Sequence, residues 1–301
     1  MARQCVQALV FLASVAFALG AENDAPRTDY HADVAEVRLT FFATDQNHHT
    51  VAAVDEKDFA VVDQDLVVRT FNSFRRAVWT DLNVAVILDS SESAAGQFKQ
   101  EIAEAMQWMT QSHEIPEQSF SLISFRASKP TLICSGNCRA GATAAPLSTP
   151  VGALTPLFDA VVLAAGVIAQ HASPHSKKAL ILFSDGEDTV SRNGEADALA
   201  AALANDIPIY AVDLNRGGRS SAGTALLQKL AGATGGRYFV LEHDPGRAFD
   251  AVLADFHAAY TVTYRVPDRT AGFHSVRILP THNLNLHFHC RGGYEYSANR
   301  N

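Results

Sequence analysis

Short apolar runs alternate with amphipathic stretches between residues 81 and 260, and this alternation constrains the fold more than any other feature of the sequence. Each run has the length of one strand and is rich in Val, Ile, Leu or Phe, which is typical of strands buried on both faces. The runs cover residues 84–88, 121–125, 179–183, 207–212 and 238–241. This order of segments predicts an α/β fold built on a parallel sheet.

The stretches between these runs carry apolar residues at helical spacing, which predicts helices that face a core. The four stripes are Phe98, Ile102, Ala105 and Met109; Leu157, Val161, Ala164 and Ile168; Leu226, Leu227, Leu230 and Ala231; and Phe249, Val252, Leu253 and Phe256. Gly235 and Gly236 are expected to end the third helix before a strand. We therefore predict that residues 81–260 form a doubly wound, mostly parallel sheet with helices on both faces.

The two flanks of this region alternate with period two, which predicts strands with one buried face. Before residue 81 the candidate strands begin with Val37, Leu39 and Phe41 and continue at 59–62 and 66–71, around the polar turn 63–65. After residue 260 they lie at 260–266, 275–279 and 284–290. Neither flank has enough strands for a core of its own, so residues 21–80 and 261–301 are expected to pack together as one flanking β sandwich. The α/β region would then be an insertion in that sandwich.

The first twenty residues have the layout of a signal peptide. Arg3 precedes an apolar run over residues 6–19, small residues follow, and residues 22–27 are polar. The run is short for a membrane span, although an uncleaved anchor is the alternative. No second stretch reaches spanning length, so the mature chain is expected to be exported, either secreted or periplasmic, with no membrane span.

The charge balance excludes a function class. The chain has 32 acidic and 24 basic residues, a formal charge of −8. Binding to nucleic acid depends largely on neutralising phosphates with basic residues, so a nucleic-acid partner is not expected.

The cysteines fit an exported chain. Cys134 and Cys138 are close enough to bridge over a turn, and export favours a disulfide over a zinc site that has no further ligands nearby. Cys290 shares the apolar face of its predicted strand with Leu284, Leu286 and Phe288, which indicates a buried free thiol.

Oxygen-bearing side chains follow the first predicted strand of the α/β region. Asp89, Ser91 and Ser93 alternate in Asp-x-Ser-x-Ser, so their side chains can point the same way from an extended loop at the carboxyl end of the strand. Oxygen ligands suit a hard cation such as Mg²⁺ or Mn²⁺, with Ca²⁺ as a further candidate. Thr155, before a predicted helix, and Asp185, after a predicted strand, are expected at the same edge of the sheet and would add to the set.

This set of five resembles the metal-ion-dependent adhesion site (MIDAS) of von Willebrand factor type A domains, which have a Rossmann-like fold. The resemblance implies a metal held directly by the hydroxyls of Ser91 and Ser93 and, in one state, by that of Thr155, with Asp89 and Asp185 often acting through water. It also implies that an Asp or Glu of a protein partner completes the coordination. The segments 58–62, 273–278 and 291–294 resemble those of exported bacterial "VWFA-related" proteins of the acidobacterial type, which extends the resemblance over most of the mature chain.

The function implied is an exported, divalent-metal-dependent module for protein binding and cell adhesion. One alternative is a scaffold in which the metal is purely structural. Another is a metal-assisted hydrolase, but the sequence has no Gly-x-Ser-x-Gly motif and no evident general base, so we do not expect an enzyme. In a third, the five oxygens only cap helices and satisfy turns.

Histidine pairs offer a last alternative. His287 and His289 share a strand face, and His48 and His49 are adjacent, so a transition-metal site is conceivable. Exposed histidines on a strand and a loop are the preferred interpretation.

Overall fold

The structure is a computed structural model that describes residues 35–78, 81–91, 119–126, 128–136, 138, 154–173, 176–215, 221–241 and 246–297. Three predictions lie outside the described residues: the signal peptide 1–20, the helix around residues 98–109, and Ser93.

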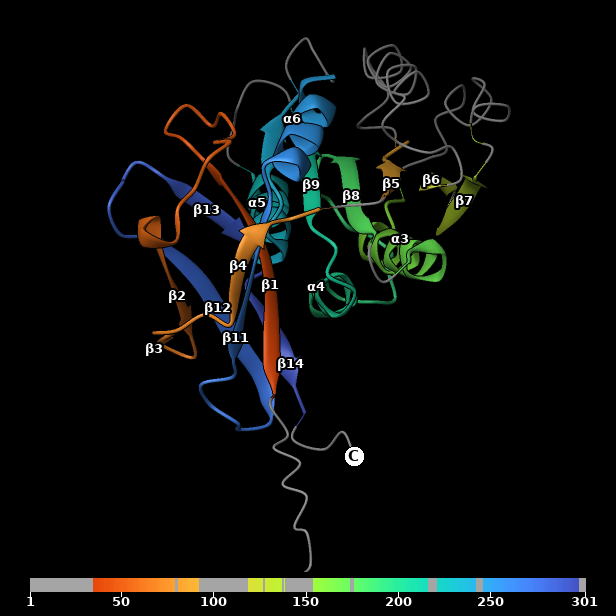
Figure 1. Ribbon diagram of the computed structural model, residues 1–301. Helices are drawn as coiled ribbons and strands as arrows, with labels where there is room; N and C mark the ends of the chain where they lie inside the picture. Colours follow the sequence, from red (N-terminus) through yellow and green to blue (C-terminus); the bar gives the residue numbers. More distant parts are fainter. Residues whose placement is uncertain are drawn as a thin grey trace, which may run out of the picture. The chain divides into compact units, whose positions relative to one another are not determined.

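A six-stranded mixed sheet forms the centre of the α/β region, in the order β10-β9-β8-β5-β6-β7. The five apolar runs correspond to five parallel strands, which confirms the predicted parallel sheet (Figure 1). These strands are β5 (Leu82–Leu88), β6 (Phe120–Arg126), β8 (Lys177–Ser184), β9 (Ile209–Asp213) and β10 (Tyr238–Val240). An additional strand, β7 (Lys129–Ser135), pairs antiparallel with β6 at one edge.

Helices pack on the two faces of this sheet in the described part of the chain. Alternate residues of β5 belong to two different buried clusters, Val84 and Val86 to one and Ala85 and Ile87 to the other. The first cluster includes residues of α6 (Gly246–His257), and the second includes residues of α3 (Leu157–His171), α4 (Glu195–Ala204) and α5 (Ala222–Thr234). The apolar stripes predict α3, α5 and α6 but not α4.

Two four-stranded sheets, in the orders β13-β1-β11-β4 and β14-β12-β2-β3, combine strands from both ends of the described chain. The strands are β1 (Glu36–Thr44), β2 (Phe59–Asp63), β3 (Leu66–Val67), β4 (Ser73–Arg76), β11 (Tyr260–Arg265), β12 (Gly272–Pro280), β13 (His287–Cys290) and β14 (Gly293–Tyr296). A single-turn 3₁₀ helix, η1 (Glu56–Asp58), precedes β2. Leu39 and Val262 of the first sheet and Val61 and Ile278 of the second belong to one buried cluster.

Two flank predictions need correction. The strand expected at 66–71 is the two-residue β3, and the chain re-enters a sheet only at β4. The strand expected at 284–290 begins at His287, and Leu284 is 72% exposed instead of facing the core. A run of apolar residues continues past the point where neighbouring strands supply hydrogen bonds, so periodicity alone overestimates strand length.

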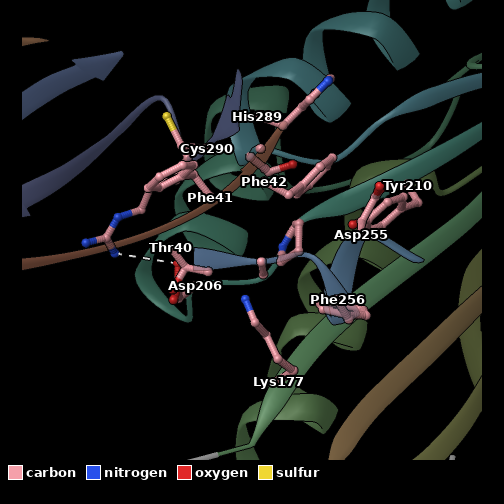
Figure 2. A pocket seen from close by; sticks show the side chains of 15 residues that line it. Thr40, Phe41, Phe42, Lys177, Asp206, Tyr210, Asp255, Phe256, His289 and Cys290 are labelled. Carbon is pink, nitrogen blue, oxygen red and sulfur yellow. Dashed lines mark ion pairs between the residues drawn. The ribbon is translucent and has the colours of Figure 1, made fainter. Parts of the chain in front are cut away.

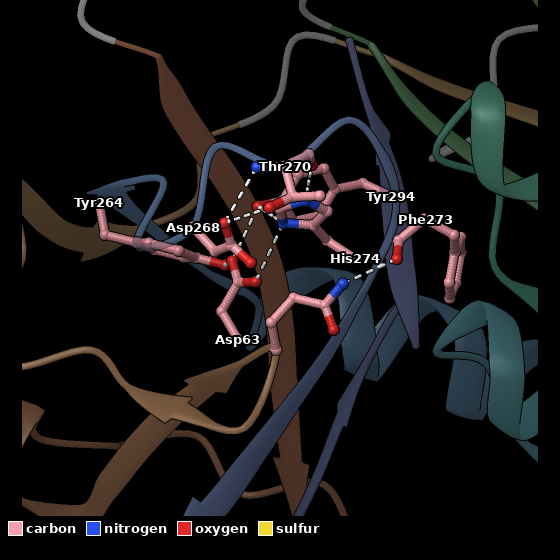
Figure 3. A network of polar contacts seen from close by, with 8 residues as sticks. Asp63, Tyr264, Asp268, Thr270, Phe273, His274 and Tyr294 are labelled. Carbon is pink, nitrogen blue, oxygen red and sulfur yellow. Dashed lines mark hydrogen bonds and ion pairs between the residues drawn. The ribbon is translucent and has the colours of Figure 1, made fainter. Parts of the chain in front are cut away.

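A buried carboxylate links the two four-stranded sheets (Figure 3). Asp63 at the end of β2 is fully buried, and its Oδ2 accepts hydrogen bonds from Tyr264 Oη of β11 at 2.9 Å and Tyr294 Oη of β14 at 2.8 Å. His274 Nδ1 of β12 lies 3.5 Å from Asp63 Oδ1. His274 Nε2 donates to the main-chain oxygen of Thr270 at 2.7 Å. Because Tyr264 comes from one sheet and the other three side chains from the second, this Asp63 network fixes their mutual position.

The end of α5 lies directly against the turn between β13 and β14. Gly235 ends α5 with φ of 80°, as predicted for a glycine at a helix C-terminus. A Cβ on Gly235 would lie 2.4 Å from the carbonyl carbon of Cys290, and Gly292 N donates to Ala233 O at 2.7 Å. Main chain therefore meets main chain at this contact, which requires a residue without a side chain.

The described cysteines occupy two environments. Cys134 and Cys138 form a disulfide with a Cα–Cα distance of 5.4 Å, the pairing that export favours. Cys290 is a free thiol and is only partly exposed, and burial raises its pKa to about 12.

Candidate functional site: a polar edge at the carboxyl ends of β5 and β8

Asp89 and Asp185 directly follow two neighbouring parallel strands. β5 and β8 pair in register, with Leu88 opposite Phe183, so both chains leave the sheet at the same edge (Figure 1). Asp89 N donates to Phe183 O at 2.9 Å and extends the pairing by one residue. Carboxyl edges of parallel sheets are where ligands bind in open α/β folds.

The Asp89 carboxylate is fully buried and held at both oxygens. Oδ1 accepts a hydrogen bond from Ser91 N at 3.0 Å, and Oδ2 accepts one from Ser184 Oγ at 2.7 Å. Burial raises the pKa of Asp89, hydrogen bonds from Ser91 and Ser184 oppose this, and the negative charge of Asp185 raises it further. Because Asp89 and Asp185 follow two paired neighbouring strands, their negative charges lie at the same edge, and a bound cation would offset the repulsion between them.

Thr155 is tied to the loop that follows β8. Thr155 N donates to Thr189 Oγ1 at 2.8 Å, and Thr189 N donates to Thr155 O at 2.9 Å. Thr155 is 3% exposed. These reciprocal bonds hold the start of α3 beside the loop that begins with Asp185.

The N-terminus of α3 is capped by this same loop. Phe158 N donates to Asp188 Oδ1 at 3.3 Å and Asp159 N donates to Ser191 Oγ at 3.1 Å. Asp188 and Ser191 therefore fill the capping role that the alternative interpretation gives to Thr155. The Asp188 carboxylate is half-buried and also accepts a hydrogen bond from Ser191 Oγ at 2.5 Å, so it is part of the folded loop and not a freely solvated acid.

Four of the five predicted metal ligands lie at this edge, and the fifth, Ser93, is outside the described residues. Asp89, Ser91, Thr155 and Asp185 are exposed by 0%, 3%, 3% and 8%, respectively. All four offer oxygen donors, which fit a hard divalent cation, and two neighbouring buried carboxylates supply the negative charge. The described residues contain no group of three or more His, Cys, Asp or Glu placed to hold a metal.

The histidine alternative has little support. His289 Nε2 lies 3.0 Å from Thr44 Oγ1, and its ring stacks on Phe42 with a centroid distance of 4.7 Å. Burial lowers the pKa of His289 to about 4. These contacts assign His289 a packing role.

One residue near this edge, Asn215, belongs to none of the sequence motifs. Asn215, just after β9, donates through Nδ2 to the main-chain oxygen of Asp185 at 2.8 Å and to Asp213 Oδ1 at 2.8 Å. A sequence clue exists, because Asp213 is another acidic residue at the carboxyl end of a parallel strand.

A separate small cavity lies where β1 and β13 meet the α/β region (Figure 2). Its lining includes Lys177, Tyr210, Asp255 and His289. Burial lowers the pKa of Lys177 to about 7 and raises that of Asp255 to about 6, although Arg237 lowers the latter. The volume, about 30 Å³, suits one or two water molecules and not an organic substrate.

None of the helices in the described residues is long and apolar enough to cross a membrane.

Comparison with known proteins finds similarity at the level of solved structures. No protein-family model matches the chain, and no curated protein matches it. Proximal thread matrix protein 1 from the mussel byssus has 12% identity and a TM-score of 0.45, over 60% of this chain and 48% of that protein. The same mussel protein with a zinc-occupied MIDAS motif has 11% identity and a TM-score of 0.44, with the same coverage. An aerotolerance-related membrane protein from Bacteroides fragilis has 15% identity and a TM-score of 0.42, over 58% of this chain and 98% of that one. The chain thus spans about half the length of the mussel protein.

Proposed function

We propose that this chain is an exported, divalent-metal-dependent protein-binding module of the von Willebrand A type, with its α/β unit inserted in a β sandwich. The observation that carries the proposal is the buried polar edge at which Asp89 and Asp185 follow two neighbouring strands beside the start of α3. The metal ligands would be Asp89, Ser91, Ser93, Thr155 and Asp185, and the ion Mg²⁺ or Mn²⁺.

The division of labour among the side chains follows from their charge. When bound, the metal supplies a positive charge that can accept a carboxylate of a partner. The serine and threonine hydroxyls contribute neutral oxygens, so they hold a cation without cancelling its charge. Asp89 is oriented by Ser91 N and Ser184 Oγ, which fixes the direction of its remaining lone pairs. The proposal therefore names an acidic residue of a protein as the partner group and assigns the chain no catalytic role.

Thermal unfolding with and without metal tests the site. A ligand that binds only the folded state stabilises it by about 2.7 kcal/mol at a concentration one hundred times its Kd. We expect millimolar Mn²⁺ to raise the melting temperature of the wild type but not of Asp185→Asn. Glu187→Gln is the matched control, because Glu187 is an exposed acid in the same loop and its change should leave the shift intact. An unchanged wild-type melting curve would contradict the proposal.

Capture experiments test the protein-binding part. Material bound to the immobilised chain from the organism's own extract should be released by EDTA and should not bind Asp185→Asn. Stabilisation by metal without any EDTA-sensitive partner would instead support the scaffold alternative.

A further inference from the structure

A buried carboxylate lies beside the proposed metal edge, on the next strand of the sheet. Asp213 ends β9, the neighbour of β8, and is 2% exposed. Its Oδ1 accepts hydrogen bonds from N and Nδ2 of Asn215, both at 2.8 Å. Its Oδ2 accepts from Thr224 Oγ1 at 2.7 Å and from Tyr238 Oη at 2.8 Å. Four charge-assisted bonds offset the cost of burying this carboxylate and make it a rigid anchor.

The anchor orients the amide of Asn215. The Nδ2 group donates to Asp213 Oδ1 and to the main-chain oxygen of Asp185, at 2.8 Å in each case, and makes a longer contact of 3.4 Å with Ser221 Oγ. Asn215 therefore joins the buried carboxylate to the main chain of a predicted metal ligand.

The start of α5 contacts the same carbonyl group. Ser221 caps this helix by accepting a hydrogen bond from Thr224 N at 3.0 Å, and Thr224 Oγ1 donates to Asp213. Gly223, which lies between Ser221 and Thr224 in the sequence, packs against the main chain of Asp185 so closely that a Cβ on it would lie 2.1 Å from the main-chain oxygen of Asp185. The Asp185 carbonyl thus accepts a hydrogen bond from Asn215 and packs against the start of α5. Asp213 holds both Asn215 and the start of α5 in place through its own hydrogen bonds.

We propose that Asn215, oriented by Asp213, is a positioning residue for the metal site: it fixes the main chain of Asp185 and thereby the direction of that residue's carboxylate. This inference rests on the proposed function. It deepens that function by adding a residue which does not touch the metal but sets the affinity for it. Partners that orient metal ligands typically change metal affinity by 10- to 100-fold when they are removed.

Direct titration of the full chain with Mn²⁺, with free ion measured by electron paramagnetic resonance, tests the inference. Asn215→Ala should raise the Kd for Mn²⁺ by about tenfold or more. Asn205→Ala is the matched control, because Asn205 Nδ2 makes the same kind of bond, to Ala201 O at 2.8 Å, at the end of α4. Its Kd should stay at the wild-type value. Melting curves in EDTA provide a second measurement, since a merely structural role would lower the metal-free melting temperature and leave the Kd unchanged.

The outcomes separate the two proposals. If wild type and Asn215→Ala bind Mn²⁺ equally, the positioning role is overturned while the proposed function stands. If wild type binds no Mn²⁺, both are overturned. If Asn215→Ala does not fold, Thr224→Val and Thr224→Ser decide, because only serine keeps the hydroxyl that donates to Asp213. A raised Kd in Thr224→Val alone supports the inference, and equal values in the two variants overturn it.

Discussion

Removal of the Tyr264 hydroxyl should destabilise the protein more than its small size suggests. Tyr264 is fully buried and donates to the equally buried Asp63 carboxylate, so Tyr264→Phe leaves the ring in place and takes away only one charged hydrogen bond (Figure 3). Within the described residues, Asp63 Oδ1 has no hydrogen-bond partner. The hydrogen bonds that this carboxylate accepts therefore all go to Oδ2, while His274 Nδ1 lies 3.5 Å from Oδ1.

The magnitude follows from the kind of bond. A hydrogen bond to a charged group contributes about 1.5–3 kcal/mol, and one between neutral groups about 0.5–1.5 kcal/mol. Because Tyr294 still donates to Oδ2 at 2.8 Å, we expect Tyr264→Phe to cost about 1.5–2 kcal/mol of unfolding free energy. The double variant Tyr264→Phe/Tyr294→Phe should cost more than the sum of the single changes, by about 1 kcal/mol, because the carboxylate then loses both donors.

Urea denaturation at pH 7 measures these differences, and strand β11 supplies a matched control. Tyr260 lies in the same strand, but its hydroxyl donates to the neutral carbonyl of Ala52 at 3.3 Å and accepts from Val54 N at 3.2 Å. Tyr260→Phe should therefore cost less than Tyr264→Phe. Equal losses in the two variants would refute the argument that a buried charge makes the Tyr264 bond valuable.

Three further predictions concern single residues. Because burial lowers the pKa of His289 to about 4, the stability that neutral His289 provides is complete above pH 6.5 and is lost as pH falls toward 4. The urea midpoints measured at pH 7 and pH 4.5 should therefore differ less in His289→Asn than in wild type. The control His287→Asn, at an exposed position, should behave like wild type. Gly186 has φ of 82°, and a Cβ on it would lie 2.3 Å from the carbonyl oxygen of Gly223, so Gly186→Ala should lower the free energy of unfolding by more than about 1 kcal/mol. The control Gly232→Ala, in open space on α5, should be neutral or stabilising. A higher melting temperature for Gly186→Ala than for Gly232→Ala would contradict the prediction. Cys290, with a pKa of about 12, should resist a thiol reagent at pH 8 in the folded protein and react after unfolding. Peptide mass mapping measures the labelling. Rapid labelling of Cys290 in the folded chain would contradict the prediction.

Sequence patterns predict those elements of the fold whose core residues are large. The five parallel strands are visible because Val, Ile, Leu and Phe fill both faces. α4 has no such mark, since it buries only Ala198 and Ala202, and small side chains form no apolar stripe. β7 is also hidden, because an edge strand is half solvated and this one begins with Lys129 and Pro130.

The candidate site is likewise predictable from the sequence only in part. Asp89 and Asp185 are predictable because an acid directly after a buried parallel strand must lie at the ligand-binding edge. The capping of α3 by Asp188 and the bond from Asn215 to Asp185 are not, because both join loops about thirty residues apart. Such contacts depend on the packed fold and leave no periodic pattern in the sequence.

The pairing of β1 determines when the protein can finish folding. Both strands beside β1, which are β11 and β13, come from the far end of the chain, and β2 likewise pairs with β12. During synthesis β1 and β2 are made long before the strands that pair with them. The backbone N–H and C=O groups of their edges therefore stay unpaired while roughly two hundred further residues are added. The growing chain therefore needs protection against premature association until its last strands have been made, and truncation near the C-terminus should leave β1 exposed as a site for aggregation.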